Sequence, residues 1–325
     1  YRIGQPVRET LESRDKMNPT YSTVFNVKVE PGISGNVFNS IKVSADLEGF
    51  RKGKEGEPKG IQWEIRLYKD SKKVEFVYQA DKEIVTDPEG LYVAFPFRLA
   101  DSKIVFETIG ATLAQGEQLP GSSSDWNVAQ NFVSVKGPKG QIIMVSDEVP
   151  LWQFGDFNIG KFERYPRAGK PRLYSWVMNN YWFTNFRAFQ LGELRWTYTL
   201  STTADTSITA ATKFAWSVRN PLAARPLPAG RNDLVNPVFK TVNITGDENV
   251  VLINSRPSFT GNGSVVFHFR ETDGKPAKIR LASQIAGRQV KSIRQVNVRG
   301  EKIEDLDIKN IPFNPYEVKF IEAAF

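Results

Sequence analysis

The sequence has 325 residues, of which 40% are hydrophobic, 12% aromatic and 24% charged. These fractions are typical of a folded globular protein, and no segment approaches the roughly 20 consecutive apolar residues that a membrane helix requires. The net charge of +7 does not by itself indicate a nucleic-acid partner, because the 43 basic residues are interspersed with 36 acidic ones. We therefore expect neither a membrane nor a nucleic-acid partner, and the length favours two domains.

Alternation of apolar and polar residues with a period of two dominates the first two thirds of the chain and predicts strands. The segments at residues 60–68 and 73–80 flank a polar turn and are expected to form a hairpin. Clusters of Gly, Pro, Asn, Asp or Ser separate the segments, as in meandering antiparallel sheets. The further predicted strands are residues 22–30, 39–47, 90–99, 102–110, 130–137, 141–148, 171–178 and 193–203.

Helical patterns are scarce. The candidates are residues 234–242 and residues 204–219, and the second has Asp205 or Thr206 as a possible N-cap. Because Thr and Val are frequent in residues 204–219, a β segment there is an equally open alternative. A Pro-rich stretch follows at residues 220–237 and is the expected domain boundary. Beyond it, short strands are predicted at residues 237–244, 249–259, 263–272, 277–283, 291–300 and 317–325, with the spacing of a small β-sandwich. We therefore predict an all-β protein with domains at residues 1–232 and 233–325.

The rare residue types limit the chemistry. The absence of cysteine excludes disulfides, thiolate metal sites and cysteine nucleophiles. The one histidine, His268, shares a predicted strand face with Val266 and Arg270, so we expect a strand residue and not a catalytic base. The chain opens at Tyr1 without an initiator Met or an apolar signal core, which predicts a processed or cut piece. Composition leaves the compartment open, with the periplasm or the exterior favoured.

Two segments carry candidate carbohydrate-contacting side chains. In the first, a Gly- and Ser-rich loop presents Asp125 and Trp126 just ahead of a strand. The second is SWVMNNYWFTNFRAFQ at residues 175–190, which combines six aromatic residues with Asn and Gln side chains. Aromatic rings stack on the apolar face of a sugar, and amides or carboxylates bind its hydroxyls. The alternative, that Trp126 plugs the end of the sandwich, is slightly favoured over sugar binding.

Within the second segment, Asn179 and Asn180 are suited to a tight turn. We expect the four aromatic residues Trp176, Phe183, Phe186 and Phe189 to pack in the interior, and Asn180, Trp182 and Asn185 to be exposed. The complete set of candidate carbohydrate-binding residues is Asp125, Trp126, Asn179, Asn180, Trp182, Asn185 and Gln190.

Several spaced words of the sequence resemble glycoside hydrolase family 38, the retaining α-mannosidases. They are DKEIVTDPEGLYVAFPFRL (81–99), GEQLPGSSSDWNVAQNFVSV (116–135), SDEVPLWQFGDFNIGKF (146–162), MNNYWFTNFRAFQLGELRWTYTL (178–200), FHFRETDGKPAKIRLAS (267–283) and NPYEVKFIE (314–322). They occur in family order over nearly the whole chain. The resemblance is to the C-terminal β domains of the family.

The resemblance implies a galactose-mutarotase-like supersandwich for residues 1–232 and an immunoglobulin-like sandwich for the remainder. In the family, the nucleophilic aspartate and the zinc belong to an N-terminal catalytic domain, and no catalytic residue matches a position in this chain. The resemblance therefore predicts no catalytic residue, metal site or cofactor here, with zinc only in an upstream catalytic domain of the same polypeptide.

The expected function is that of a non-catalytic region that supports this catalytic domain and contacts a mannoside-like glycan. Two alternatives remain open at this point. One is a stand-alone carbohydrate-binding or structural module. The other is a sugar enzyme on a mutarotase-like scaffold, for which His268 is poorly placed.

Overall fold

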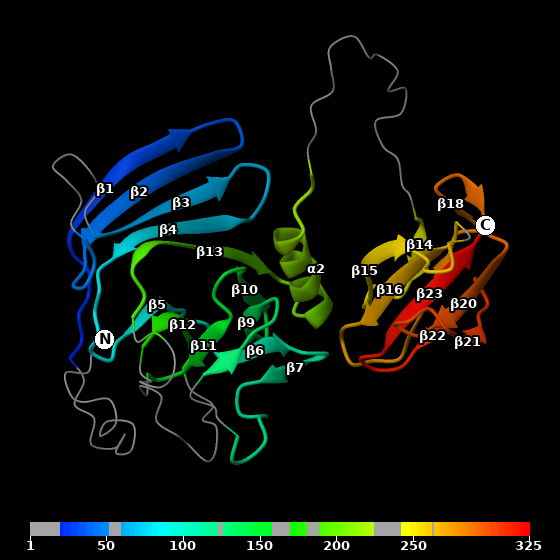
Figure 1. Ribbon diagram of the computed structural model, residues 1–325. Coiled ribbons are helices and arrows are strands. Elements are labelled where there is room, and N and C mark those ends of the chain that lie inside the picture. The colour runs from blue at the N-terminus through cyan, green and yellow to red at the C-terminus, as the bar shows by residue number, and fades with distance from the viewer. Residues whose placement is uncertain are drawn as a thin grey trace, which may run out of the picture. The chain divides into compact units, whose positions relative to one another are not determined.

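A computed structural model describes residues 20–51, 60–122, 126–157, 170–180, 187, 189–223, 242–261 and 263–325 (Figure 1). The chain forms two compact units. The first comprises residues Tyr1–Thr206 with Phe214–Arg219, and the second comprises Ser207–Lys213 with Asn220–Phe325. The predicted boundary between residues 232 and 233 lies outside the described residues. In the described part of the chain, strands prevail and all named strand pairs are antiparallel, which confirms the all-β prediction.

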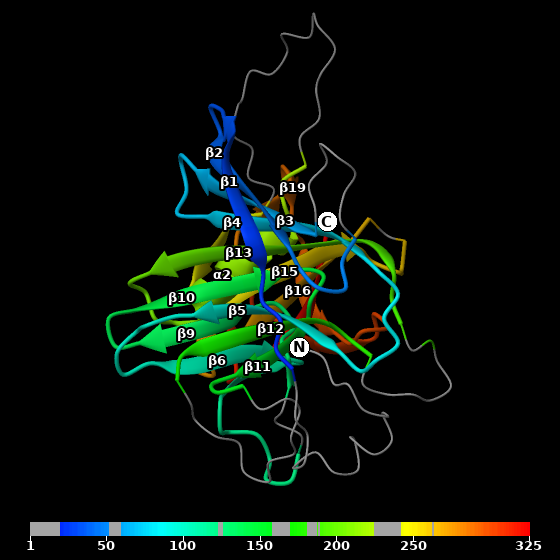
Figure 2. The ribbon, with the colours of Figure 1, turned by 90° about the vertical axis from the view of Figure 1, so that its left-hand side faces the viewer.

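The first unit contains a nine-stranded sheet in the order β1-β2-β3-β4-β13-β10-β9-β6-β7 and a four-stranded sheet in the order β5-β12-β11-β8. Figure 2 shows β4, β13, β10, β9 and β6 of the larger sheet in sequence. The strands are β1 (Phe25–Ser34), β2 (Phe38–Asp46), β3 (Ile61–Tyr68), β4 (Val74–Lys82), β5 (Gly90–Pro96), β6 (Lys103–Thr108), β7 (Ala111–Ala114), β8 (Asn127–Val128), β9 (Val133–Gly137), β10 (Gly140–Ser146), β11 (Leu151–Phe154), β12 (Arg172–Asn179) and β13 (Gly192–Thr203).

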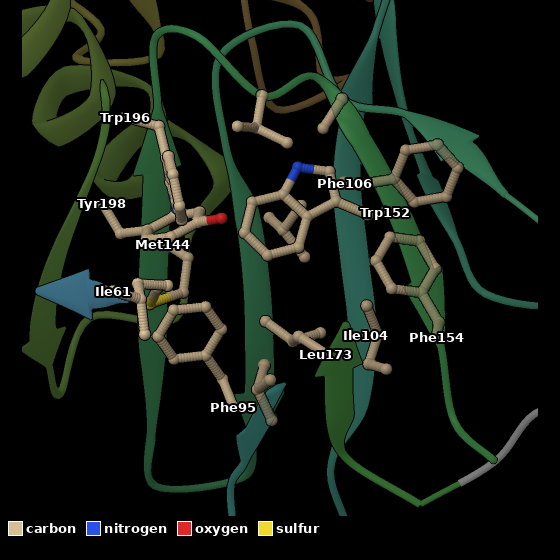
Figure 3. Close-up of a cluster of buried hydrophobic side chains, with 14 of the residues drawn as sticks. Ile61, Phe95, Ile104, Phe106, Met144, Trp152, Phe154, Leu173, Trp196 and Tyr198 are labelled. Carbon is tan, nitrogen blue, oxygen red and sulfur yellow. The ribbon is translucent and has the colours of Figure 1, made fainter. Parts of the chain in front are cut away.

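Apolar side chains from both sheets meet in one core (Figure 3). Tyr198 of β13 contacts Phe95 of β5 edge-to-face, with ring centroids 5.0 Å apart, and Trp152 of β11 at 5.9 Å. Its hydroxyl donates to Ser175 Oγ of β12 at 2.8 Å. Burial raises the pKa of Tyr198, so the phenol stays neutral and keeps this bond. The two sheets therefore pack face to face as a sandwich.

The predicted hairpin at residues 60–80 is confirmed, because β3 and β4 pair from Ile61 with Ala80 to Leu67 with Val74. On one face of this hairpin Glu64, Arg66 and Glu75 form a ladder, in which Arg66 bonds Glu64 at 2.7 Å and Glu75 at 3.0 Å. Apolar and aromatic side chains occupy the opposite face. The alternation read from the sequence thus separates a polar surface from the interior.

The second unit contains a three-stranded sheet, β14-β17-β22, a five-stranded sheet, β15-β16-β23-β20-β21, and the hairpin β18-β19. Phe267 and Phe269 of β16 are buried in its core, where Phe269 contacts Phe313 at 6.4 Å. The strands are β14 (Ile244–Gly246), β15 (Val250–Pro257), β16 (Val265–Glu271), β17 (Ala277–Leu281), β18 (Gln284–Ile285), β19 (Arg288–Gln289), β20 (Ser292–Val296), β21 (Lys302–Asp305), β22 (Ile311–Phe313) and β23 (Val318–Ala324).

The segment RETDG at residues 270–274 is the centre of a hydrogen-bond network in the second unit. The carboxylate of Glu271 is fully buried and accepts bonds from Asn249 Nδ2 and from the backbone N–H groups of Asp273, Gly274 and Tyr316, at 2.7–2.9 Å. Gly274 has φ +69°, and a Cβ there would lie 2.6 Å from the Tyr316 ring. Glycine is therefore required, and this word of the resemblance has a structural role.

Residues 204–219, for which a helix and a β segment were both open, contain helix α2 (Ile208–Arg219), and its N-cap is Ser207 and not Asp205 or Thr206. Ser207 Oγ accepts the Ala210 N–H at 3.0 Å. Asp205 instead lies in the turn after β13, where its own N–H donates to Thr203 Oγ1 and its carbonyl accepts from Gln141. The side chain nearest the first turn therefore takes the cap.

Replacing Ser207 with alanine should lower the free energy of unfolding by about 1 kcal/mol, because one N–H of the first turn loses its acceptor. Urea denaturation measures this change. Ser217→Ala is the matched control, since the Ser217 hydroxyl is exposed and bonds only the Phe214 carbonyl within the helix. That control should be nearly neutral, and an equal loss in both variants would contradict the assignment of the cap.

Candidate functional site

A cavity of about 590 Å³ opens in the first unit between the β3-β4 half of the larger sheet and β5, an edge strand of the smaller one. Residues 21–24 line a third side. This volume is within the roughly 300–1,000 Å³ typical of small-molecule pockets. Because residues from both sheets and from the segment before β1 meet here, the cavity depends on the tertiary fold of the unit.

The wall from the larger sheet is an aromatic row across three strands. Trp63, Tyr78 and Trp196 occupy paired positions on β3, β4 and β13. Tyr78 stacks on Trp63 with centroids 5.7 Å apart and on Trp196 at 5.1 Å. Burial raises the pKa of Tyr78 to about 12, so its phenol is neutral at physiological pH. Trp63 and Tyr78 line the cavity, and the buried Trp196 supports them.

The opposite wall is also aromatic. Tyr92 of β5 stacks on Trp176 of β12 with centroids 5.5 Å apart and meets Phe157 edge-on at 4.7 Å. Phe157 in turn contacts Tyr174 at 5.3 Å and Tyr21 at 6.2 Å. All of these except Trp176 line the cavity. Each ring is held by another ring, so the wall is largely formed before any ligand arrives.

Charged groups close one end of the cavity. Lys82, whose side chain is 1% exposed, pairs with Glu89 at 2.8 Å and donates to the carbonyls of Gly49 and Glu83 at 2.9 and 3.2 Å. The ammonium is also 5.1 Å from the Phe50 ring. Glu48 accepts a bond from Ser22 Oγ at 2.8 Å. The cavity thus presents two carboxylates and one ammonium beside two aromatic walls.

Two of the predicted site residues, Trp126 and Asn180, contact residues of the cavity wall or of the side chains that support it. Trp126 contacts Trp176 with ring centroids 5.2 Å apart, and Trp176 stacks on Tyr92 of the cavity wall. Asn179 is the last residue of β12 and is half-buried, whereas Gln190 is exposed. Asp125, Trp182 and Asn185 lie outside the described residues, as do Phe183 and Phe186. The predicted burial of Trp176 is confirmed.

The expectation that Asn180 is exposed is wrong. Its side chain is buried, and its amide holds the loop between β4 and β5. The Nδ2 group donates to the carbonyls of Val85 and Asp87 at 3.0 and 3.1 Å, and Oδ1 accepts from the N–H of Glu89 at 2.6 Å. Asn180 therefore positions Glu89 at the cavity.

His268 belongs to β16 of the second unit, where its ring stacks on Phe320 at 4.6 Å. Burial, together with the nearby charge of Arg270, lowers the pKa of His268, so the imidazole is neutral at pH 7. In the described residues, no group of three or more His, Asp or Glu side chains is arranged to hold a metal ion. No helix among them is long and apolar enough to span a bilayer.

Sequence reasoning missed the cavity residues Trp63, Tyr78, Tyr92 and Glu89. The alternation in residues 60–80 does place Trp63 and Tyr78 on the apolar face, but it assigns that face to the core. A clue was available, because aromatic residues recur at inward positions of consecutive strands. The alternation does not reveal which residues of the smaller sheet lie opposite these side chains.

No protein-family model matches the sequence, and no curated protein matches it. Solved structures do share its fold. A protein of glycosyl hydrolase family 38 from Enterococcus faecalis matches with a TM-score of 0.64 and 11% identity, over 94% of this chain and 36% of that one. An alpha-mannosidase from Enterococcus faecalis V583 matches with a TM-score of 0.66 and 12% identity, over 94% of this chain and 35% of that one.

The chain therefore spans about a third of the length of the solved structures that it matches. At this level of identity the likeness establishes the fold. It confirms at the level of fold the resemblance predicted from spaced words of the sequence: this chain has the architecture of a part of glycosyl hydrolase family 38 proteins.

Proposed function

We propose that this chain is a non-catalytic β region of a family 38-like glycoside hydrolase, which stabilises a catalytic domain of the same polypeptide and contacts its carbohydrate. The observation that carries the proposal is the fold shared over 94% of this chain with only 35–36% of the family 38 structures. A match of this kind is what a supporting part of a larger enzyme would give. The zinc and the hydrolytic chemistry are proposed to belong to the catalytic domain.

The carbohydrate contact is proposed for the first unit. Its support is the cavity with two aromatic walls and carboxylates at one end, which is the combination that sugar rings require. Trp126 contacts Trp176, the ring on which Tyr92 of the cavity wall is stacked. Because Trp176 is buried and does not line the cavity, Trp126 lies behind the Tyr92 wall, and a sugar contact at Trp126 is proposed in addition to the one in the cavity.

The isolated 325-residue chain should show no turnover of aryl α-mannosides above a protein-free blank, with zinc added and across the pH range. The assay is the release of the aryl group, followed across the fractions of a sizing column. A contaminating full-length enzyme would elute earlier, because the family 38 relatives are about three times longer than this chain. Turnover that coincides with the chain's own elution peak would contradict a non-catalytic role.

A further inference from the structure

We propose that the cavity in the first unit is a binding site for one pyranoside residue of a glycan, held non-covalently between the two aromatic walls. The proposal rests on the carbohydrate contact proposed above, and it adds the position, the ligand class and the contacting groups. It concerns equilibrium binding, so it does not depend on which polypeptide performs hydrolysis.

The first argument is the chemistry of the walls. A pyranose ring has two faces rich in C–H groups, and these pack on aromatic surfaces whose faces carry negative partial charge. Trp63 and Tyr78 stand on one side of the cavity, and Tyr92 and Tyr174 on the other. A compact chair-shaped ring whose C–H groups pack on aromatic faces is a ligand that this pair of walls suits.

The second argument is the polar end. A sugar has a rim of hydroxyl groups that both donate and accept hydrogen bonds, and a carboxylate offers about four acceptor positions. Lys82 uses one oxygen of Glu89, Oε1, at 2.8 Å. The N–H of Glu89 is itself fixed by Asn180 at 2.6 Å. Glu89 is thus a rigid acceptor with capacity for ligand hydroxyls.

The third argument distinguishes a neutral sugar from a cation. Aromatic cavities with carboxylates also bind quaternary ammonium groups. Here, however, the ammonium of Lys82 already lies in the cavity lining, 5.1 Å from the Phe50 ring and paired with Glu89. Because Lys82 already neutralises Glu89, this carboxylate is not available as the counter-charge of a second cation, whereas a neutral polyol needs no counter-charge. The pairing of Glu89 with Lys82 therefore favours a neutral ligand such as a pyranoside at this carboxylate.

The fourth argument is preorganisation. Tyr78 is stacked between Trp63 and Trp196, and Tyr92 is stacked on Trp176. Rings that are fixed by neighbouring rings lose little conformational freedom when a ligand binds. A single sugar residue buries a small area, so we expect a dissociation constant of about 1 mM.

Calorimetric titration of the full chain with the non-hydrolysable methyl α-thiomannoside should show saturable one-site binding. Trp63→Ala should weaken this binding at least about tenfold, and Trp63→Phe should recover part of it, because a smaller ring remains. The matched control is Phe259→Ala, which removes an aromatic ring that is 69% exposed in the second unit. Far-UV circular dichroism and thermal unfolding of each variant establish that it folds.

Three results would overturn the proposal. The first is no saturable thiomannoside, glucoside or galactoside binding at concentrations up to about 50 mM. The second is unchanged binding in a folded Trp63→Ala protein, which would place the sugar elsewhere. The third is saturable binding of choline or cyclohexanol with none of the sugars, which would identify a cation or a purely apolar site. Because the thioglycoside is not hydrolysed, none of these results bears on the predicted lack of turnover.

Discussion

Replacing Glu89 with leucine should lower the free energy of unfolding of the first unit by about 3–5 kcal/mol, because the change leaves the Lys82 ammonium buried without its counter-charge. Lys82 is 1% exposed, and its remaining partners are the carbonyls of Gly49 and Glu83. Two neutral acceptors do not replace a carboxylate at 2.8 Å. Urea denaturation followed by tryptophan fluorescence measures the loss, since all seven tryptophans lie in the segments that form this unit.

The double variant Lys82→Met/Glu89→Leu is the decisive comparison. The double variant no longer contains a buried ammonium without a counter-charge, so it should be more stable than Glu89→Leu alone. An exposed pair serves as the control: Asp305 bonds Lys302 at 2.6 Å, with side chains 75% and 47% exposed. Asp305→Ala should change stability by no more than about 1 kcal/mol. Equal losses in the Glu89 single and double variants would show that the ion pair is not the cause.

This pair also shows where sequence reasoning stops. Lys82 and Glu89 both lie in the word 81–99, which was singled out by its resemblance and not by its chemistry. Their contact requires the carbonyl of Gly49, 33 positions before Lys82, and the amide of Asn180, 91 positions after Glu89. Periodicity specifies which side chains share a strand face, but it contains no information on such long-range partners.

The strands themselves were predictable because their signal is local. The hairpin at residues 60–80 follows from alternation, whereas the pattern of residues 204–219 was compatible with a helix or a β segment, and the structure shows the helix. The site was only partly predictable. Trp126 was selected from its loop and does lie beside the cavity wall, whereas Asn180 was assigned to the surface and is buried. Its amide serves the backbone of another loop, a role that an isolated Asn-Asn pair does not reveal.

Replacing Glu271 with glutamine should destabilise the second unit by roughly 2–6 kcal/mol, although the two side chains have the same shape. Oε1 accepts from Asn249 and the N–H of Asp273, and Oε2 accepts from the N–H groups of Gly274 and Tyr316. A glutamine side chain has one oxygen and one NH₂ group. Whichever way the amide is oriented, two buried donors lose their acceptor and face another donor.

Hydrogen exchange measured on peptides from β16, β17 and β23 should show the loss of protection in Glu271→Gln, with a lowered urea midpoint by circular dichroism. Glu304→Gln is the matched control, because Glu304 is exposed on β21 and the same substitution there should change stability by less than about 0.5 kcal/mol. If Glu271→Gln were as stable as that control, the four hydrogen bonds could not be what holds the loops at residues 272–274 and 314–317 together. A loss confined to Glu271→Gln would instead show that the RETDG segment supplies a buried hydrogen-bond acceptor, so that its role in the fold is structural.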